Sequence, residues 1–210
     1  MSKNFSGKFI VLDGPDACGK STQAAMLAEW IKKSQGVQVV TYRDPGTTAV
    51  GEKIRSILLD PAHEGMEVNV ETLLYIAARA QLWAERTAAD LSAGKCVVMD
   101  RWISSTCAYQ GCAGEFGIDK VIKLCEDCLE RVWPDITVIV DVDVETACQR
   151  MNRALDRMEQ KGREYHQKVR QGFLELADSY DKVVVVDGRE TVEQVHKSVV
   201  ESVEMMLSQT

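Results

Sequence analysis

Residues 14–21 form the segment of this chain that is most specific for chemistry. They read Gly-Pro-Asp-Ala-Cys-Gly-Lys-Ser and match the pattern G-x-x-x-x-G-K-[ST]. In such a loop the glycines let backbone N–H groups curl around a phosphate, and the following helix adds the positive end of its dipole. The lysine reaches the outer phosphates and the serine hydroxyl ligates Mg²⁺. The expected phosphate-binding residues are Gly14, Pro15, Asp16, Ala17, Cys18, Gly19, Lys20, Ser21 and Thr22, with Lys20 catalytic and Ser21 a metal ligand.

A second pair of reactive residues, Asp100 and Arg101, follows an apolar run at 96–99. An acid at the carboxyl end of a buried strand can hold Mg²⁺, and a guanidinium fork matches phosphate oxygens. We therefore expect Asp100 to be a ligand of the metal and Arg101 to be a catalytic residue that holds the transferring phosphate. The alternative is that Asp100 only caps the next turn. The chain has no N-K-x-D motif, and its only D-x-x-G lies inside the phosphate loop, which disfavours a GTPase.

The elements that must position these residues follow from the hydrophobic pattern. Runs rich in Val and Ile at 9–12, 37–42, 96–99, 136–142 and 183–186 predict strands buried on both faces, as in a parallel sheet. Stretches of helical period lie between and after them, at 24–31, about 70–91, 118–132 and 191–207. The alternation predicts an α/β chain of the P-loop NTPase fold, with a five-stranded parallel sheet and helices on both faces. Since no linker or repeat is visible, residues 1–210 are expected to form a single domain.

Charge and composition narrow the class of protein. The chain has 210 residues and a net charge of −7. Broad nucleic-acid binding usually needs a basic surface, so nucleic acid is not an expected partner. No secretory signal is visible, and no run approaches the ~18 apolar residues that cross a membrane. We therefore expect a cytoplasmic location and no membrane partner.

The chain has 7 cysteines, which are expected to be buried apolar residues in a reducing compartment. Cys125 and Cys128 have C-x-x-C spacing, but no second pair of ligands has a similar spacing. A core-facing helix position is the favoured interpretation of Cys125 and Cys128, and a zinc site is the weaker alternative.

An arginine-rich segment at 150–163 differs from the rest of the chain. Its basic residues stand among acids and next to Gly162, and we expect a polar, mobile excursion between two helices rather than core. The basic residues are Arg150, Arg153, Arg157, Lys161 and Arg163.

Together with these motifs, several co-linear stretches resemble bacterial thymidylate kinases over nearly the whole chain. They are residues 9–22, 43–46 (RDPG), 53–60 (KIRSILLD), 74–82 (LYIAARAQL), 100–111 (DRWISSTCAYQG), 134–142 and 155–160 (LDRMEQ). The resemblance implies transfer of the γ-phosphoryl group of ATP to dTMP, with Mg²⁺, in dTTP synthesis. It also implies an acceptor-binding region at about 43–80 and a small helical lid at about 150–163.

The resemblance further implies which side chains bind the acceptor. Arg43 and Arg55 correspond to monophosphate-binding positions, for which a solvated basic surface is the alternative. Tyr75 and Arg79 share a helix face and correspond to positions that stack on and hydrogen-bond a pyrimidine. The full expected acceptor set is Asp16, Arg43, Pro45, Arg55, Tyr75, Arg79, Arg101, Thr106, Tyr109 and Gln110.

Two departures from the family pattern matter. Thr47 follows Gly46 where bacterial relatives usually have a second glycine, which puts the path of the acceptor loop in question. Ala17 and Cys18 carry no arginine, so the chain is similar to relatives whose catalytic arginine comes from the lid. Arg150, Arg153 and Arg157 are available there, with Arg153 and Arg157 expected to be catalytic. Lys20, Arg101, Mg²⁺ and a lid arginine are then expected to share the transition-state charge in a direct transfer.

Some alternatives stay open at this point. A kinase for another nucleoside monophosphate is the nearest one, and a nucleotide-binding regulator is a more distant one. Relatives of this family form homodimers, so a homodimer is expected, although the apolar stripe from Leu73 to Trp83 fits a monomer core equally well. The cations are expected to converge on one electropositive cleft: Lys20, Arg43, Arg55, Arg79, Arg101 and the lid arginines.

Overall fold

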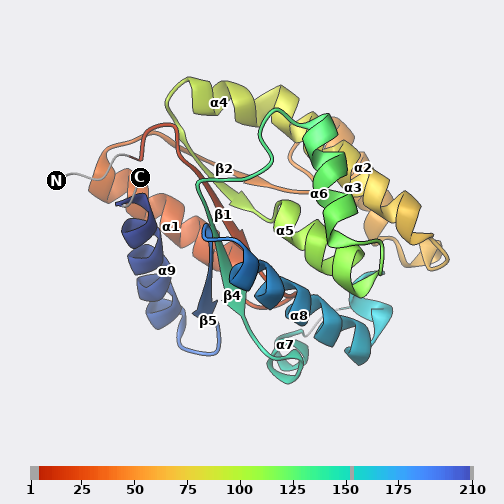
Figure 1. Ribbon diagram of the computed structural model, residues 1–210. Helices are drawn as coiled ribbons and strands as arrows, with labels where there is room; N and C mark the ends of the chain where they lie inside the picture. The colour runs from red at the N-terminus through yellow and green to blue at the C-terminus, as the bar shows by residue number, and fades with distance from the viewer. Residues whose placement is uncertain (1–4, 152–153, 209–210) are drawn as a thin grey trace.

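The computed structural model describes residues 5–151 and 154–208, and their centre is a five-stranded sheet (Figure 1). The strand order is β2-β3-β1-β4-β5, and every neighbouring pair is parallel. The strands are β1 (Phe9–Asp13), β2 (Val39–Arg43), β3 (Cys96–Asp100), β4 (Ile136–Asp141) and β5 (Val183–Asp187). The predicted strands and their parallel arrangement are confirmed, with small shifts at the strand ends.

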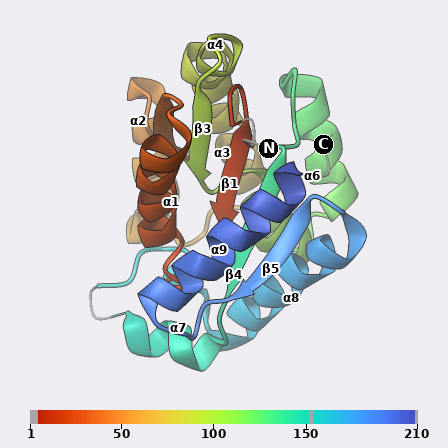
Figure 2. The same cartoon turned by 90° about the vertical axis from the view of Figure 1, so that its left-hand side faces the viewer.

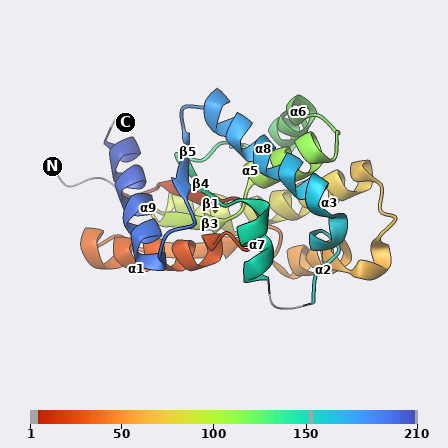
Figure 3. The same ribbon diagram turned by 90° about the horizontal axis from the view of Figure 1, so that it is seen from below.

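Helices cover both faces of the sheet, as predicted. On one face, α1 (Lys20–Gln35) and α9 (Val192–Leu207) enclose a core that includes Ile10, Leu12 and Val138. On the other face, α3 (Val68–Leu82), α6 (Ile118–Cys128) and α8 (Arg163–Ser179) pack over residues such as Phe9 and Met99. Figure 3 shows the strands between these two sets of helices. The smaller helices are α2 (Ala49–Leu59), α4 (Ala88–Ser92), α5 (Ile103–Thr106) and α7 (Val144–Arg150), with 3₁₀ turns at Pro61–His63 and Glu159–Lys161.

The sequence also explains where the two long helices of the first face begin. Gly19 precedes α1 with φ 97°, a left-handed conformation that glycine adopts without strain. Thr191 caps α9 and forms a capping box with Gln194, in which each side chain satisfies a free backbone N–H group. The start of α1 fixes where the phosphate loop ends.

The predicted helical stretch at about 70–91 is present but irregular. It runs through α3, a π-helical segment at Trp83–Thr87 and α4. The π-helical segment turns the buried Trp83 toward Phe9 and Trp102, with ring centroids 6.3 and 6.4 Å away. A second π-helical segment, Cys107–Ala113, continues α5 and carries residues that line the site described below. Such segments occur often at functional sites.

Two expectations, about the end of α6 and about the burial of the cysteines, are wrong. The helix ends at Cys128 rather than near Val132, although Leu129 and Val132 remain buried in the loop that follows. Cys125 is buried, but Cys128 and Cys148 are exposed and Cys112 is only partly buried, so the prediction of buried cysteines fails for these three. In the described part of the chain, no group of three or more His, Cys, Asp or Glu side chains could hold a metal ion.

The segment at 154–162 also differs from its prediction. The side chains of Arg157, Met158 and Glu159 are buried, and Met158 packs in one cluster with Tyr109 and Phe173. The backbone N–H of Arg157 donates to the carbonyl oxygen of Leu59 at 3.1 Å, which ties the segment to the end of α2. These residues are therefore part of a packed core and not a polar excursion.

All strands run in one direction, so their carboxyl ends lie on one side of the molecule. In Figure 2 the arrowheads of β1 and β3 point toward the side on which α7 lies. The loops that follow β1, β2 and β3 meet there, where open α/β sheets bind their ligands.

Candidate active site

The loop between β1 and α1 has the shape of an anion-binding cradle. Gly14 has φ 136°, and a Cβ atom added there would lie 2.4 Å from the Val140 carbonyl oxygen, so only glycine fits. Ala17 adopts φ 57° and Gly19 φ 97°, which curls the loop. Lys20 Nζ donates to the Pro15 carbonyl oxygen at 2.8 Å, across the loop. Backbone amides and an ammonium group held in this way suit a phosphate chain.

Ser21 and Asp100 meet beside this loop because β1 and β3 are neighbours. The Ser21 hydroxyl donates to Asp100 Oδ2 at 2.5 Å. A hydroxyl and one carboxylate are hard oxygen donors, and Mg²⁺ typically takes one or two of these while keeping waters and phosphate oxygens. The pair therefore fits a magnesium ion that arrives with a nucleotide.

Asp13, the last residue of β1, joins the phosphate loop to the segment after β3. Its fully buried carboxylate accepts hydrogen bonds from the hydroxyls of Ser104 and Ser105, both at 2.6 Å, and from the backbone N–H of Gly14 at 2.9 Å. Sequence reasoning missed this residue. The available signal was an acid at the end of a buried strand, directly before the glycine of the loop.

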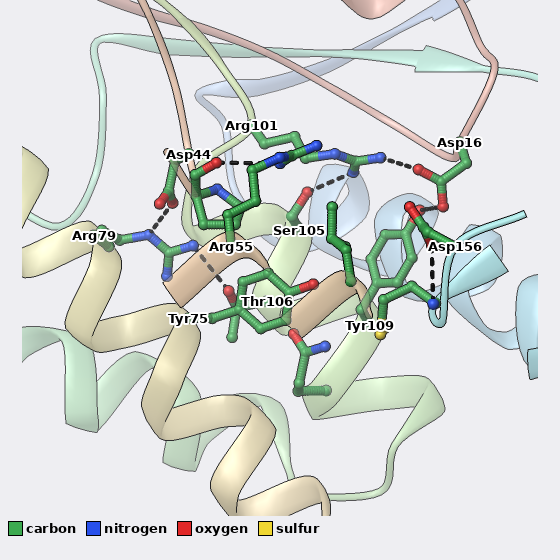
Figure 4. Close-up of a pocket in the computed structure, with 14 residues that line it drawn as sticks. Asp16, Asp44, Arg55, Tyr75, Arg79, Arg101, Ser105, Thr106, Tyr109 and Asp156 are labelled. Atoms are coloured by element: carbon green, nitrogen blue, oxygen red, sulfur yellow. Dashed lines mark hydrogen bonds and ion pairs between the residues drawn. The ribbon is translucent and has the colours of Figure 1, made fainter. Parts of the chain in front are cut away.

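Arg101 connects the loop to the acceptor side of the cleft (Figure 4). Its guanidinium is ion-paired with Asp16 and donates to the Ser105 hydroxyl at 2.8 Å. It also lies over the Tyr109 ring, 5.3 Å from the centroid. The Tyr109 hydroxyl in turn donates to Asp16 at 2.7 Å. Burial by itself would raise the pKa of Asp16, but the charges of Arg101 and Lys20 and the Tyr109 hydroxyl hold the pKa at about 2.

A cavity opens beside Asp16 and Arg101, and every expected acceptor residue except Arg43 lines it. The residues come from the loops after β1, β2 and β3, from α2 and α3, and from the segment after α7. Figure 4 shows their side chains gathered around this space. Lining residues that were not predicted are Asp44, Leu59, Ser105, Asp156 and Met158.

Arg79 lines this cavity, and most of its hydrogen-bond donors are already used by protein groups. Its Nε donates to Asp44 Oδ2 at 2.7 Å, and its Nη2 donates to Thr106 Oγ1 at 2.9 Å (Figure 4). The side chains of Arg79 and Asp44 are 1% and 0% exposed. Burial opposes the charge on Arg79, but Asp44 beside it raises the pKa of the guanidinium above its ordinary value. The pair holds the planar group at a fixed angle to the cavity.

Arg43 lies outside the cavity, in the adjoining groove that contains Ser21 and Asp100. It forms a half-exposed ion pair with Glu52 at 2.9 Å. Thr47, in the same turn, has φ 68°, a left-handed conformation that favours glycine. Thr47 therefore adopts the backbone conformation that the glycine of bacterial relatives would adopt in this turn.

The expected convergence of cations on one cleft is found only in part. Arg55, Arg79 and Arg101 line the cavity, but Asp16, Asp44 and Asp156 line it too, so the lining has no excess of positive charge. Arg157 Nη2 is ion-paired with Glu71 Oε2 at 2.6 Å, which turns it toward α3. Arg153, the other expected lid arginine, lies outside the described residues.

The comparisons with known proteins agree with this geometry. Residues 12–199 match the thymidylate kinase family. The chain is 42% identical over 203 residues to the thymidylate kinase of Caldanaerobacter subterraneus subsp. tengcongensis, covering 96% of this chain and 97% of the relative. It is 39% identical over 203 residues to the thymidylate kinase of Thermoanaerobacter sp. strain X514, covering 96% and 99%.

A solved structure shows the same arrangement of elements. The crystal structure of thymidylate kinase from Ehrlichia chaffeensis superposes with a TM-score of 0.77 at 30% identity and covers 94% of this chain and 98% of that one. The family match, the two relatives and the solved structure each cover nearly the whole chain. The chain therefore belongs to the thymidylate kinase family of enzymes.

Proposed function

We propose a division of labour among these residues for the reaction of the family, in which the γ-phosphoryl group of ATP passes to dTMP with the help of Mg²⁺ and gives dTDP and ADP. One observation carries the proposal: the acceptor cavity opens directly beside the phosphate loop. Asp16 of the loop lines the cavity, and so does Arg101, which is ion-paired with Asp16. The chain acts as one nucleotide-kinase domain, with the acceptor region at about 43–80 and the lid at about 150–163.

The donor side uses the backbone of the loop and a few side chains. The loop amides and Lys20 bind the β- and γ-phosphates, and Ser21 and Asp100 hold Mg²⁺. When bound, Mg²⁺ supplies positive charge to the phosphate oxygens. Lys20 supplies the same kind of charge from inside the loop, where burial strengthens its effect.

The acceptor side holds a monophosphate and a pyrimidine. Arg55 and Arg101 bind the monophosphate, with Arg43 contributing from the adjoining groove. Burial and the charge of Arg43 lower the pKa of Arg55, so an anion placed between these arginines is stabilised. Tyr75 stacks on the pyrimidine and Arg79, Thr106 and Gln110 meet its polar edge, while Pro45, Asp16 and Tyr109 complete the walls.

The transfer needs positioning more than proton transfer. A phosphate monoester is already an anionic nucleophile at neutral pH, so no general base is required. Arg101 donates to the Gly14 carbonyl oxygen and to the Ser105 hydroxyl, and these contacts with both halves of the cleft support a role in holding the two reacting phosphates in line. We assign the remaining positive charge to a lid arginine, Arg153 or Arg157.

The kinetics of Arg157→Ala test that assignment. A fall in kcat of about 10²–10³ at saturating dTMP supports contact with the transferring phosphate. A rise in KM for dTMP with kcat unchanged contradicts this contact and assigns Arg157 to the acceptor side. Arg153→Ala, measured in parallel, shows which lid arginine lowers kcat.

The function itself is tested with a panel of acceptors. ADP release is followed with ATP and Mg²⁺ and with dTMP, dUMP, dCMP or dGMP as the acceptor. We expect dTMP to give the highest kcat/KM. A better acceptor than dTMP overturns the substrate assignment, and tight ATP binding without transfer to any acceptor supports a regulatory protein instead.

The assembly and location are part of the same proposal. Apolar side chains on the neighbouring helices α2 and α3 are exposed, namely Val50, Ile57, Val70 and Leu73, and they suit a homodimer contact. Sedimentation at micromolar concentration tests the homodimer, and a monomer at that concentration contradicts it.

None of the helices in the described residues has the length and apolar character of a membrane span. The exposed thiols of Cys128 and Cys148 suit the reducing cytoplasm, and the net charge of −7 favours neither nucleic acid nor anionic membranes as partners.

A further inference from the structure

A buried carboxylate lies behind the acceptor cavity, where the lid segment 154–162 meets α3. Glu71, in the first turn of α3, is 0% exposed. Its Oε1 accepts a hydrogen bond from Gln110 Nε2 at 2.7 Å, and its Oε2 is ion-paired with Arg157 Nη2 at 2.6 Å. Lys161 Nζ donates to the same two oxygens at 3.1 and 3.0 Å. One carboxylate therefore joins a residue that lines the cavity to two cations of the lid segment.

The chemistry of this contact decides how the Gln110 amide is oriented. An ionised carboxylate can only accept hydrogen bonds, so the group of Gln110 that faces Glu71 must be its NH₂. The carbonyl oxygen of the amide is then the end left for the cavity, which Gln110 lines although its side chain is almost fully buried. A nucleotide bound in the cavity would therefore meet the Gln110 carbonyl oxygen, a group that can only accept hydrogen bonds.

We infer that Glu71 is a positioning residue that sets pyrimidine specificity through Gln110. Thymine and uracil carry an N3–H donor, which the Gln110 carbonyl oxygen can accept. Cytosine carries a bare N3 acceptor at the same position, so two acceptors would face each other without a proton between them. A buried polar group left without a partner destabilises the complex, which disfavours cytosine at this point. The inference rests on the proposed placement of the pyrimidine beside Gln110.

The lid cations Arg157 and Lys161 stabilise the buried carboxylate of Glu71, because a buried carboxylate without a counter-ion is strongly destabilising. Arg157 is held in place by a hydrogen bond from its Nε to the Leu58 carbonyl oxygen at 2.7 Å. Lys161 also lies over the Tyr165 ring, 4.7 Å from the centroid, and the Tyr165 hydroxyl donates to the Tyr109 carbonyl oxygen at 2.8 Å. The packing of the lid and the orientation of Gln110 thus depend on the same carboxylate.

A double-mutant cycle tests the inference. The variants are Glu71→Gln, Gln110→Ala and the two combined, and the readout is the ratio of kcat/KM for dTMP to kcat/KM for dCMP. An amide at position 71 can donate as well as accept, so it no longer fixes which end of Gln110 faces the cavity. We expect each single variant to lower the ratio about 10-fold, and the double variant to lower it no further than Gln110→Ala alone.

The outcomes separate this inference from the function on which it rests. An unchanged ratio in Gln110→Ala overturns the placement of the pyrimidine. A ratio that falls in Gln110→Ala but not in Glu71→Gln, or two effects that add fully, overturns the role of Glu71 alone. Glu67→Gln, an exposed acid one turn earlier, is the matched control and should leave the ratio unchanged.

A second variant covers the case in which Glu71→Gln fails to fold. Glu71→Gln combined with Arg157→Met removes both fully buried charges together, and the remaining cation, Lys161, is 26% exposed and can be hydrated. A ratio between two acceptors cancels any loss of activity common to both. We expect the same 10-fold fall, and an unchanged ratio in this folded variant overturns the inference.

Discussion

The donor half and the acceptor half of the cleft are built in different ways. The donor half is one continuous loop whose shape is set by glycine conformations, and in the proposed function its backbone does most of the phosphate binding. The acceptor half is assembled from side chains that are far apart in the sequence, and it depends on buried ion pairs such as Arg79–Asp44 and Arg157–Glu71. Binding and folding can therefore be separated in the donor half, whereas in the acceptor half the same side chains serve both.

The largest expected effect concerns the donor half. Lys20→Met should lower kcat by about 10³, because the ammonium group stabilises charge that develops on the phosphates. The free energy of unfolding should change little, since the hydrogen bonds of Lys20 Nζ within the described residues go to its own loop, to Pro15 and Cys18. Steady-state kinetics and urea unfolding measure the two quantities. Lys33→Met, on the exposed side of α1, is the control, and a loss of kcat below 10-fold in Lys20→Met would contradict the assignment.

The acceptor half should respond in the opposite way. Arg79→Met leaves the fully buried carboxylate of Asp44 without its counter-ion, and breaking a buried pair costs about 3–5 kcal/mol of stability. Urea unfolding measures the loss. Asp44→Asn combined with Arg79→Met should be more stable than Arg79→Met alone, because the uncompensated charge is gone.

An exposed pair supplies the matched control for this loss of stability. Lys123→Met breaks the pair with Asp127 on the surface of α6 and should leave the unfolding midpoint almost unchanged. If Arg79→Met and Lys123→Met unfold at the same urea concentration, the contrast between the two halves of the cleft is lost.

Asp16 belongs to both halves, and the pH dependence of stability tests how firmly it is held. Its pKa falls from 3.8 to about 2 on folding, so the ionised form is stabilised by about 2 kcal/mol. That contribution is fully present above about pH 4 and is lost as the pH falls toward 2. The difference in free energy of unfolding between wild type and Asp16→Asn should therefore narrow between pH 5 and pH 2.5. A constant difference would show that Arg101 does not hold Asp16 in its charged form.

The smallest effect is expected at the edge of the acceptor half. Thr47→Gly removes the strain of a left-handed threonine, worth about 1–2 kcal/mol. It also removes the hydrogen bond that the Thr47 hydroxyl accepts from the backbone N–H of Arg43 at 3.0 Å. In addition, the greater backbone freedom of glycine favours the unfolded chain. The two should nearly cancel, so thermal unfolding should shift by only a few degrees. A large loss of stability would show that the threonine hydroxyl, and not the backbone path, holds this loop.

Sequence reasoning worked well where the determinants are local. The five strands, the helix that starts at Lys20 and the phosphate loop each follow from neighbouring residues, because hydrophobic period and glycine conformation act over short distances. The acceptor residues were placed by resemblance to a known family rather than by their own spacing. The role of Asp13 and the burial of Arg157 were missed, because both depend on partners about 90 residues away in the chain.

The sequence by itself determined a parallel α/β fold, a phosphate loop and the membership of a kinase family, since these depend on local patterns and on co-linear motifs. Only the tertiary structure decided which charges meet. It paired Arg79 with Asp44, gave the acceptor cavity as many aspartates as arginines, and turned Arg157 toward Glu71. The physical reason is that a buried charge must find a counter-ion, and which counter-ion is near is set by how the crossovers pack and not by the order of residues along the chain.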